Sequence, residues 1–127
     1  MTKKLIPLAV PDIGENEIEL IKQVFDTNFL TEGKFTADFE SEVANYLGVK
    51  NAIACTSCTT ALHTVFECLD IKGKEVIVPD YTYPASAQAI ILAGGIPVLA
   101  DVDLESMNIS ADILEESYNE GMTVFEP

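Results

Sequence analysis

Apolar residues recur at helical spacing in the first fifty residues of the chain. The first such stretch predicts a helix from about Glu15 to Asp26. Residues 27–34 are expected to form a loop that Gly33 breaks. A second helix is then predicted, and Gly48 is placed to end it in a left-handed conformation. Its apolar face is formed by Phe39, Val43, Tyr46 and Leu47.

From residue 51 onward, short and wholly apolar runs alternate with helical segments. The runs are 52–55, 76–78, 97–101 and 122–125. Helices are expected between them, starting near residue 58, spanning Ala85–Ala93, and running from a Ser110 cap to Glu120. Apolar strands that alternate with helices indicate a mainly parallel sheet with helices on both faces, a three-layer α/β fold. We divide residues 1–127 into a helical lead-in, 1–50, and βα units, 51–127. Because these units stop without a closing helix, an incomplete domain is expected.

The turn between the first apolar run and its helix is the most informative segment. Ser57, Cys58, Thr59 and Thr60 lie where the helix begins. The first amide groups of a helix have no partner within the helix, and hydroxyl side chains add further donors, so this turn could bind a phosphate. The alternative is that Thr56 or Ser57 only caps the helix, and the local pattern leaves both interpretations open.

Cysteine spacing allows a second kind of chemistry at the same turn. Cys55 and Cys58 have the spacing of a redox-active pair, but Cys55 ends an apolar run and is expected to be buried. A zinc site would need a second ligand pair. Cys68 is expected to be a core residue of its helix, and reduced thiols fit a chain without a secretory leader.

Two further loops carry candidate side chains at the same end of the predicted sheet. Tyr81 and Tyr83 could stack on a flat ring or could simply pack within a proline-rich turn. Asp101 and Asp103 could serve acid–base or metal chemistry, but hydrogen bonds that organise their own turn are favoured. His63, the single histidine, is given no catalytic role.

The charge of the chain narrows the classes of partner. Seven lysines face 21 acidic residues, arginine is absent, and the net charge is −14, which argues against nucleic acid. With 48% hydrophobic residues the chain can form a core, and no apolar run approaches the roughly 20 residues of a membrane span. A cytoplasmic protein is expected.

Taken together, these segments resemble the nucleotide-sugar aminotransferases (DegT/StrS-like) among the fold type I pyridoxal-phosphate enzymes. The resemblance runs in order along most of the chain. Its main pieces are Phe29-Leu30-Thr31-Glu32-Gly33 with Phe39-Glu40, Ser57-Cys58-Thr59-Thr60-Ala61-Leu62, Tyr81-Thr82-Tyr83, and Gly94-Gly95-Ile96-Pro97-Val98 through Asp103.

The resemblance implies roles for particular residues. Ser57, Cys58, Thr59 and Thr60 would bind the phosphate of pyridoxal phosphate, and Tyr83 would stack on its ring. Leu30, Thr31 and Gly33 would lie near the substrate entrance. The implied reaction transfers an amino group to a keto-sugar nucleotide in a homo-oligomeric enzyme, without metal, nucleic acid or membrane.

The resemblance also implies residues that this chain lacks. Family enzymes hold the cofactor through a Schiff-base lysine later in the chain, but no lysine follows Lys74, so no catalytic residue is assigned and the chain alone is expected to be inactive. A pyridoxal-phosphate-dependent sugar dehydratase, a thiol oxidoreductase using Cys55 and Cys58, and a non-catalytic interaction domain are the alternatives.

In the family's sheet the first strand has later strands as its neighbours. The run 52–55 would therefore lack partners here, and unpaired buried backbone groups are costly. We expect this segment to pair differently, to associate with another chain, or to leave the fold only marginally stable.

Overall fold

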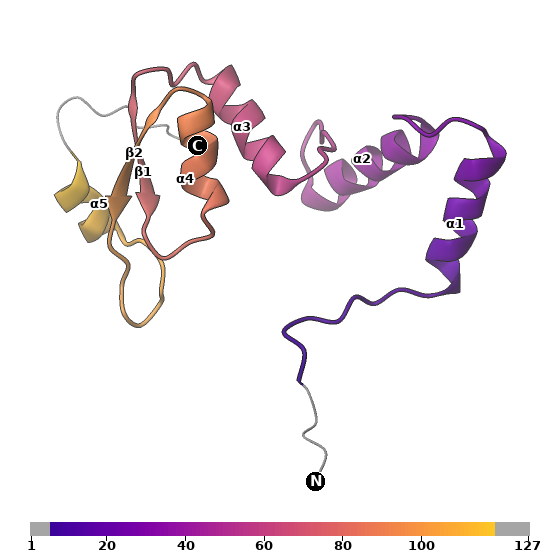
Figure 1. Cartoon of the computed structure of the whole chain (residues 1–127), viewed down its shortest axis with the longest axis horizontal. Helices are drawn as coiled ribbons and strands as arrows, with labels where there is room; N and C mark the ends of the chain where they lie inside the picture. Colours follow the sequence, from indigo (N-terminus) through magenta and orange to yellow (C-terminus); the bar gives the residue numbers. More distant parts are fainter. Residues whose placement is uncertain (1–5, 119–127) are drawn as a thin grey trace, which may run out of the picture. The chain divides into compact units, whose positions relative to one another are not determined.

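A computed structural model describes residues 6–118, which fall into two compact units divided between Ala54 and Cys55. The N-terminal unit contains α1 and α2, and the C-terminal unit contains α3, β1, α4, β2 and α5 (Figure 1). Each unit is described by itself. None of the helices formed by residues 6–118 is long and apolar enough to cross a membrane.

The N-terminal unit consists of α1 (Glu15–Asp26) and α2 (Lys34–Leu47). The bounds predicted for the first helix are confirmed, and its start is fixed by the N–H of Gly14, which donates to the Glu17 carboxylate at 2.7 Å. Gly48 ends α2 at a φ of 67°, as expected for a left-handed cap. The loop is one residue shorter than predicted, because Gly33 caps α2 and Lys34 is already helical.

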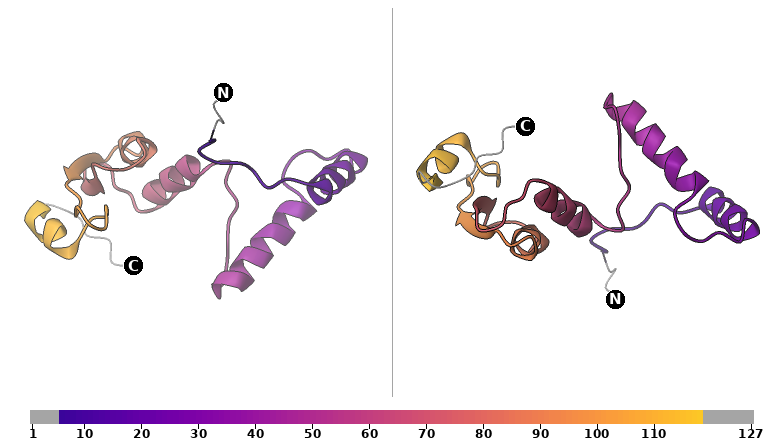
Figure 2. Two further views of the ribbon diagram at one scale, coloured as in Figure 1. Left: turned by 90° about the horizontal axis from the view of Figure 1, so that it is seen from below. Right: turned by 90° about the horizontal axis from the view of Figure 1, so that it is seen from above.

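The C-terminal unit is built around two parallel strands. Its elements are α3 (Cys58–Cys68), β1 (Glu75–Pro79), α4 (Ala85–Leu92), β2 (Ile96–Ala100) and α5 (Ala111–Ser117). The strands pair in register from Glu75 opposite Ile96 to Pro79 opposite Ala100. α4 and α5 lie on opposite sides of the strands, and α3 packs against α4 (Figure 2). The α/β fold class predicted from the sequence is confirmed, as a partial sheet.

The core of the C-terminal unit is small. Ile71, Val78, Ile90 and Ala93 are buried together, with Ile71 and Ile90 essentially inaccessible to solvent. Gly95 leads into β2, and its N–H donates to the Ile90 carbonyl at 2.9 Å, an approach so close that a Cβ there would meet the Ile71 Cδ1 at 2.7 Å. This compact centre fixes the position of α4 against both strands.

The predicted strand at 52–55 is wrong for the described residues. This segment joins no ladder, and the N–H of Ala54 instead donates to the Glu40 carboxylate at 2.7 Å. The physical reason is that a buried strand needs neighbours on its edges, and residues 6–118 provide none for it. The carboxylate of Glu40 satisfies one of the amide groups that a neighbouring strand would otherwise bind.

The burial predicted for two cysteines is also wrong. Cys55 and Cys68 are both exposed. Cys55 follows the unpaired segment, so no sheet covers it. Cys68 ends α3, whose main contact within the described part of the chain is with α4, so the rest of the helix surface faces solvent.

The helix after β2 begins where it was expected. The Ser110 hydroxyl accepts a hydrogen bond from the N–H of Ile113 at 3.3 Å, which confirms the cap. α5 ends at Ser117, earlier than the predicted Glu120, and Tyr118 is already extended. Glu120 and the apolar run 122–125 lie outside the described residues.

Candidate functional site

Three hydroxyl side chains gather at the start of α3. Ser57 is the N-cap, and its Oγ accepts a hydrogen bond from the N–H of Thr60 at 3.1 Å. The Thr60 Oγ1 lies 2.9 Å from the Ser57 Oγ and 3.3 Å from the Thr56 Oγ1. We call Thr56, Ser57 and Thr60 the hydroxyl cluster. Its geometry confirms that Ser57 caps the helix.

The hydroxyl cluster has spare donors. Its three hydroxyl groups carry three protons, and the two contacts between them use two, so one O–H is left to donate outward. The backbone N–H groups of Cys58 and Thr59 donate to no acceptor within residues 6–118. Ser57, Cys58 and Thr60 are exposed, and Thr59 is half-buried. An anion could therefore reach several donors at this helix start.

Tyr83 lies in the loop between β1 and α4. It is exposed, and it lines a shallow hollow of about 390 Å³ with Asp80, Tyr81 and Thr82. α3 and α4 contact each other, and both begin at the end of the unit toward which the strand arrows point (Figure 1). The structure thus places Tyr83 and the hydroxyl cluster at the same end of the C-terminal unit.

The carboxylates after β2 organise their own turn, as predicted. Asp101 accepts from the N–H of Val102 at 2.7 Å, and Asp103 accepts from the N–H groups of Ser106 at 2.8 Å and Glu105 at 3.1 Å. The pKa of Asp103 is lowered first by the hydrogen bond from the Ser106 backbone and then by one from the Ser106 side chain. His63 lies half-exposed on α3, 3.2 Å from the Glu67 carboxylate.

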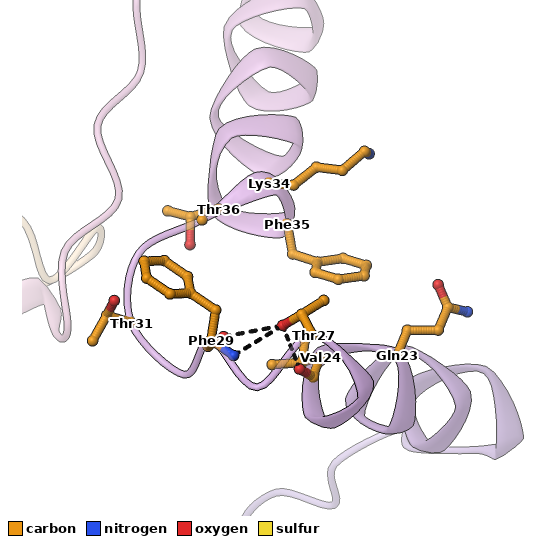
Figure 3. Close-up of a pocket in the computed structure, with 9 residues that line it drawn as sticks. Gln23, Val24, Thr27, Phe29, Thr31, Lys34, Phe35 and Thr36 are labelled. Carbon is orange, nitrogen blue, oxygen red and sulfur yellow. Dashed lines mark hydrogen bonds between the residues drawn. The ribbon is translucent and has the colours of Figure 1, made fainter.

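Residues expected near a substrate entrance lie in the N-terminal unit. Leu30, Thr31 and Gly33 belong to the loop between α1 and α2, and Thr31 and Gly33 line a pocket of about 390 Å³ (Figure 3). Leu30 is exposed and does not line it.

Two aromatic side chains in this pocket were not expected from the sequence. The pocket is also lined by Phe29 and Phe35, whose rings project from the loop and from the start of α2 (Figure 3). Thr27 holds the loop, because its hydroxyl donates to the Val24 carbonyl at 2.7 Å and accepts from the N–H of Phe29 at 3.1 Å. The sequence around Phe29 shows no regular spacing of apolar and polar residues from which this pocket could have been predicted.

The paired parallel strands with helices on both sides place this chain among the α/β proteins. Comparison with known families makes this specific. Residues 11–122 match the model of the DegT/DnrJ/EryC1/StrS aminotransferase family, and the chain belongs to that family.

Similar proteins in this family include sugar-modifying enzymes. GDP-perosamine synthase of Caulobacter vibrioides is 42% identical over 112 residues, which cover 87% of this chain and 30% of that protein. A sugar aminotransferase structure from Streptococcus pneumoniae, described as putative and in its PLP form, has a TM-score of 0.86 and 31% identity, and the match covers 92% of this chain and 30% of that one. The Escherichia coli GDP-4-keto-6-deoxy-D-mannose-3-dehydratase with bound hydrated PLP has a TM-score of 0.83 and 25% identity, and the match covers 91% of this chain and 31% of that one. The chain thus spans about 30% of the length of these relatives.

Proposed function

We propose that this chain forms the N-terminal, phosphate-binding part of a pyridoxal-phosphate-dependent aminotransferase that acts on a keto-sugar nucleotide. The observation that carries the proposal is the start of α3, where the N–H groups of Cys58 and Thr59 and one hydroxyl proton are free to donate. Membership of an aminotransferase family supports pyridoxal phosphate as the anion that would bind there.

The donor set fits the phosphate of pyridoxal phosphate. A phosphate dianion accepts several hydrogen bonds at once and is favoured at the positive end of a helix dipole. Ser57 keeps the first turn of α3 in place by accepting from Thr60, so the Cys58 and Thr59 amides stay oriented outward. No acidic residue lies in the first turn of α3 to repel the anion.

The remaining part of the cofactor would lie against Tyr83. An exposed phenol ring at the same end of the unit offers a flat apolar face for a pyridine ring. The bound cofactor supplies an electron sink for amino-group transfer. Within this chain the proposed tasks are to bind and orient it, since no lysine follows Lys74 to hold it covalently.

Substrate contacts are proposed for the loop before α2. Leu30, Thr31 and Gly33 would border the entrance for the nucleotide sugar. Thr31 and Gly33 line the pocket between α1 and α2. The same proposal includes an amino donor as the second substrate, a cytoplasmic location and a role in polysaccharide biosynthesis. It also includes a homo-oligomeric assembly, in the first place a homodimer.

A dehydratase is the second candidate, because a dehydratase with bound hydrated PLP shares this fold over 91% of the chain. The same cofactor site serves both reactions. The two candidates differ in the residue at the position of the covalent lysine. An aminotransferase would retain this lysine, and a dehydratase would carry another residue there.

Cofactor binding can be tested on the chain itself with pyridoxamine 5′-phosphate, which has no aldehyde to react with lysines. We expect the amide NMR signals of Cys58, Thr59 and Thr60 to shift on titration, and pyridoxamine without its phosphate to leave them unchanged. Thr60→Val should weaken binding about tenfold, the usual effect of losing a hydrogen bond to a charged group.

Thr64→Val is the matched control, because the Thr64 hydroxyl donates within its own helix to the Thr60 carbonyl at 2.9 Å. It should bind like the unchanged chain. Equal binding of pyridoxamine and its phosphate ester, or shifts confined to residues outside the start of α3, would refute the cofactor site.

The reaction can be tested in a chimaera. Residues 11–122 would replace the matching segment of the Caulobacter vibrioides GDP-perosamine synthase, to which this chain is 42% identical. We expect the folded chimaera to retain the amino-transfer activity and to lose it when Thr60→Val is added at limiting cofactor. A folded, cofactor-loaded chimaera without any transfer activity would contradict the assignment.

A further inference from the structure

Two thiols flank the residues that shape the proposed phosphate site. Cys55 and Cys58 are both exposed, and Cys58 is the first residue of α3. The two residues between them, Thr56 and Ser57, are members of the hydroxyl cluster. A covalent link between the thiols would therefore enclose the segment that positions the cluster.

The chain between the thiols already bends rather than running straight. Bends occur at Thr56 and Ser57, and the Thr56 hydroxyl reaches forward to Thr60 at 3.3 Å. Only two residues separate the cysteines, so a disulfide between them would close a short loop within this exposed turn. A disulfide requires Cα atoms about 4.4–6.8 Å apart.

Closing the disulfide conflicts with the present geometry of the helix cap. Ser57 has extended backbone angles, φ −160° and ψ 161°, and this conformation lets its Oγ accept from the N–H of Thr60. We expect closure of this short loop to move Ser57 out of its extended conformation. We expect the hydrogen bond from the Thr60 N–H to Ser57 and the hydroxyl contacts of Thr60 with Ser57 and Thr56 to be lost, and the amides of Cys58 and Thr59 to be reoriented.

We propose that Cys55 and Cys58 form a redox modification site, and that their disulfide, made by exchange with a small-molecule disulfide of the glutathione class, weakens cofactor binding at the start of α3. In the exchange the two cysteine S–H bonds and the S–S bond of the oxidant break, and one protein S–S bond forms. The two electrons and two protons pass to the oxidant, which leaves as two thiols.

The effect is reciprocal. A phosphate ester that binds the reduced form more tightly also shifts the thiol–disulfide equilibrium toward the reduced form by the same factor. This coupling rests on the proposed function, whereas formation of the disulfide does not.

The test uses the full chain carrying Cys68→Ser, so that only the pair remains. The chain is equilibrated in buffers of varied reduced and oxidised glutathione, and free thiols are alkylated and counted by mass. We expect an intramolecular disulfide whose fraction follows the buffer ratio. Accumulation of glutathione adducts, intermolecular disulfides or fully reduced chain alone would overturn the proposal.

Pyridoxamine 5′-phosphate is then titrated into the reduced and oxidised forms. Binding to the oxidised form should be at least about fivefold weaker. The Cys55→Ser, Cys68→Ser double variant cannot form the intramolecular disulfide, and the fraction that mass shows to carry no glutathione adduct at Cys58 should bind equally after exposure to either buffer. Equal affinity of the reduced and oxidised forms of the Cys68→Ser chain would overturn the coupling alone. If the reduced form does not bind, the coupling and the proposed cofactor site are both overturned.

Discussion

Gly95 has less room around it than any other glycine in the described residues. A Cβ built there would meet the Ile71 Cδ1 at 2.7 Å, the Ile90 Cγ2 at 2.9 Å and the Ile90 carbonyl oxygen at 3.2 Å. Both isoleucines belong to the small core and are fully buried. The backbone therefore approaches the core at a point where no side chain fits.

Gly95→Ala is expected to destabilise the C-terminal unit by about 1–3 kcal/mol, because overpacking forces buried side chains from their positions. Hydrogen-exchange protection of the β1 and β2 amides would measure the loss. Adding Ile71→Val removes the nearest methyl group and should restore part of the protection. An alanine variant with unchanged exchange rates would show that the overlap is relieved without cost.

Asp103 gives the turn after β2 a dependence on pH. Its hydrogen bonds hold the pKa below the ordinary value of about 3.9. Because the folded pKa is depressed, the stabilisation is fully present above the unfolded value and is lost as pH falls through the folded one. A carbon-detected NMR titration should give a midpoint below that of an ordinary aspartate, and Ser106→Ala should raise it. A midpoint at the ordinary value in the unchanged chain would contradict the hydrogen-bonded turn.

Among the helices, α2 depends on the glycine that caps its C-terminal end. Gly48 has a φ of 67°, and a Cβ there would meet nothing within 4 Å. The whole cost of a side chain at this position is therefore conformational. The helix itself buries only Ala44, so its cap matters more than it would for a packed helix.

Gly48→Ala should destabilise the end of α2 by about 1 kcal/mol, and Gly48→Asn by less, because asparagine tolerates the left-handed conformation better. The Cα chemical shifts of residues 34–47 would report fraying of the last turn. The order alanine worse than asparagine is the decisive result. The reverse order would mean that the left-handed cap does not control this helix end.

The elements that could be predicted from the sequence are those defined by local signals. α1 starts beside a Gly14–Glu17 hydrogen bond, and α5 begins with a Ser110 cap, both of which involve neighbours three residues apart. The strand expected at 52–55 was wrong because strand formation depends on distant partners, which no local pattern reports. The exposure of Cys55 follows from the same missing partners.

The candidate site, like the fold, could be predicted from the sequence only where local signals define it. A serine and threonines before an apolar helix predict a cap and free amide groups, and Ser57 does cap α3. Two other contributions depend on how side chains are oriented in space. These are the contribution of Thr56 to the hydroxyl cluster and that of Phe29 and Phe35 to the pocket before α2. Sequence spacing alone does not encode those orientations.

For the molecule as a whole, burial is sparse. Among the described residues eight apolar side chains are buried, and only Ile71, Val78 and Ile90 are larger than alanine. Large apolar side chains from both units remain exposed, including Tyr46, Ile53 and Leu99. Burial on this scale offsets little of the entropy lost on folding.

We therefore expect the isolated chain either to self-associate or to unfold with weak cooperativity. Sedimentation over a range of concentrations, combined with urea unfolding followed by circular dichroism, would distinguish these outcomes. A shallow transition indicates weak cooperativity, and a mass that rises with concentration indicates association. A monomer with a steep, cooperative transition would refute the expectation.

The strands β1 and β2 pair directly and are connected by α4, which affects the order in which structure forms during synthesis. Both strands and the helix that joins them come from residues 75–100, so their contacts close over a short stretch of chain. Contacts of low sequence separation form fastest. Within the C-terminal unit, we expect this strand–helix–strand segment to be the first to acquire tertiary structure during synthesis, whereas residues 52–55 pair with no strand among residues 6–118.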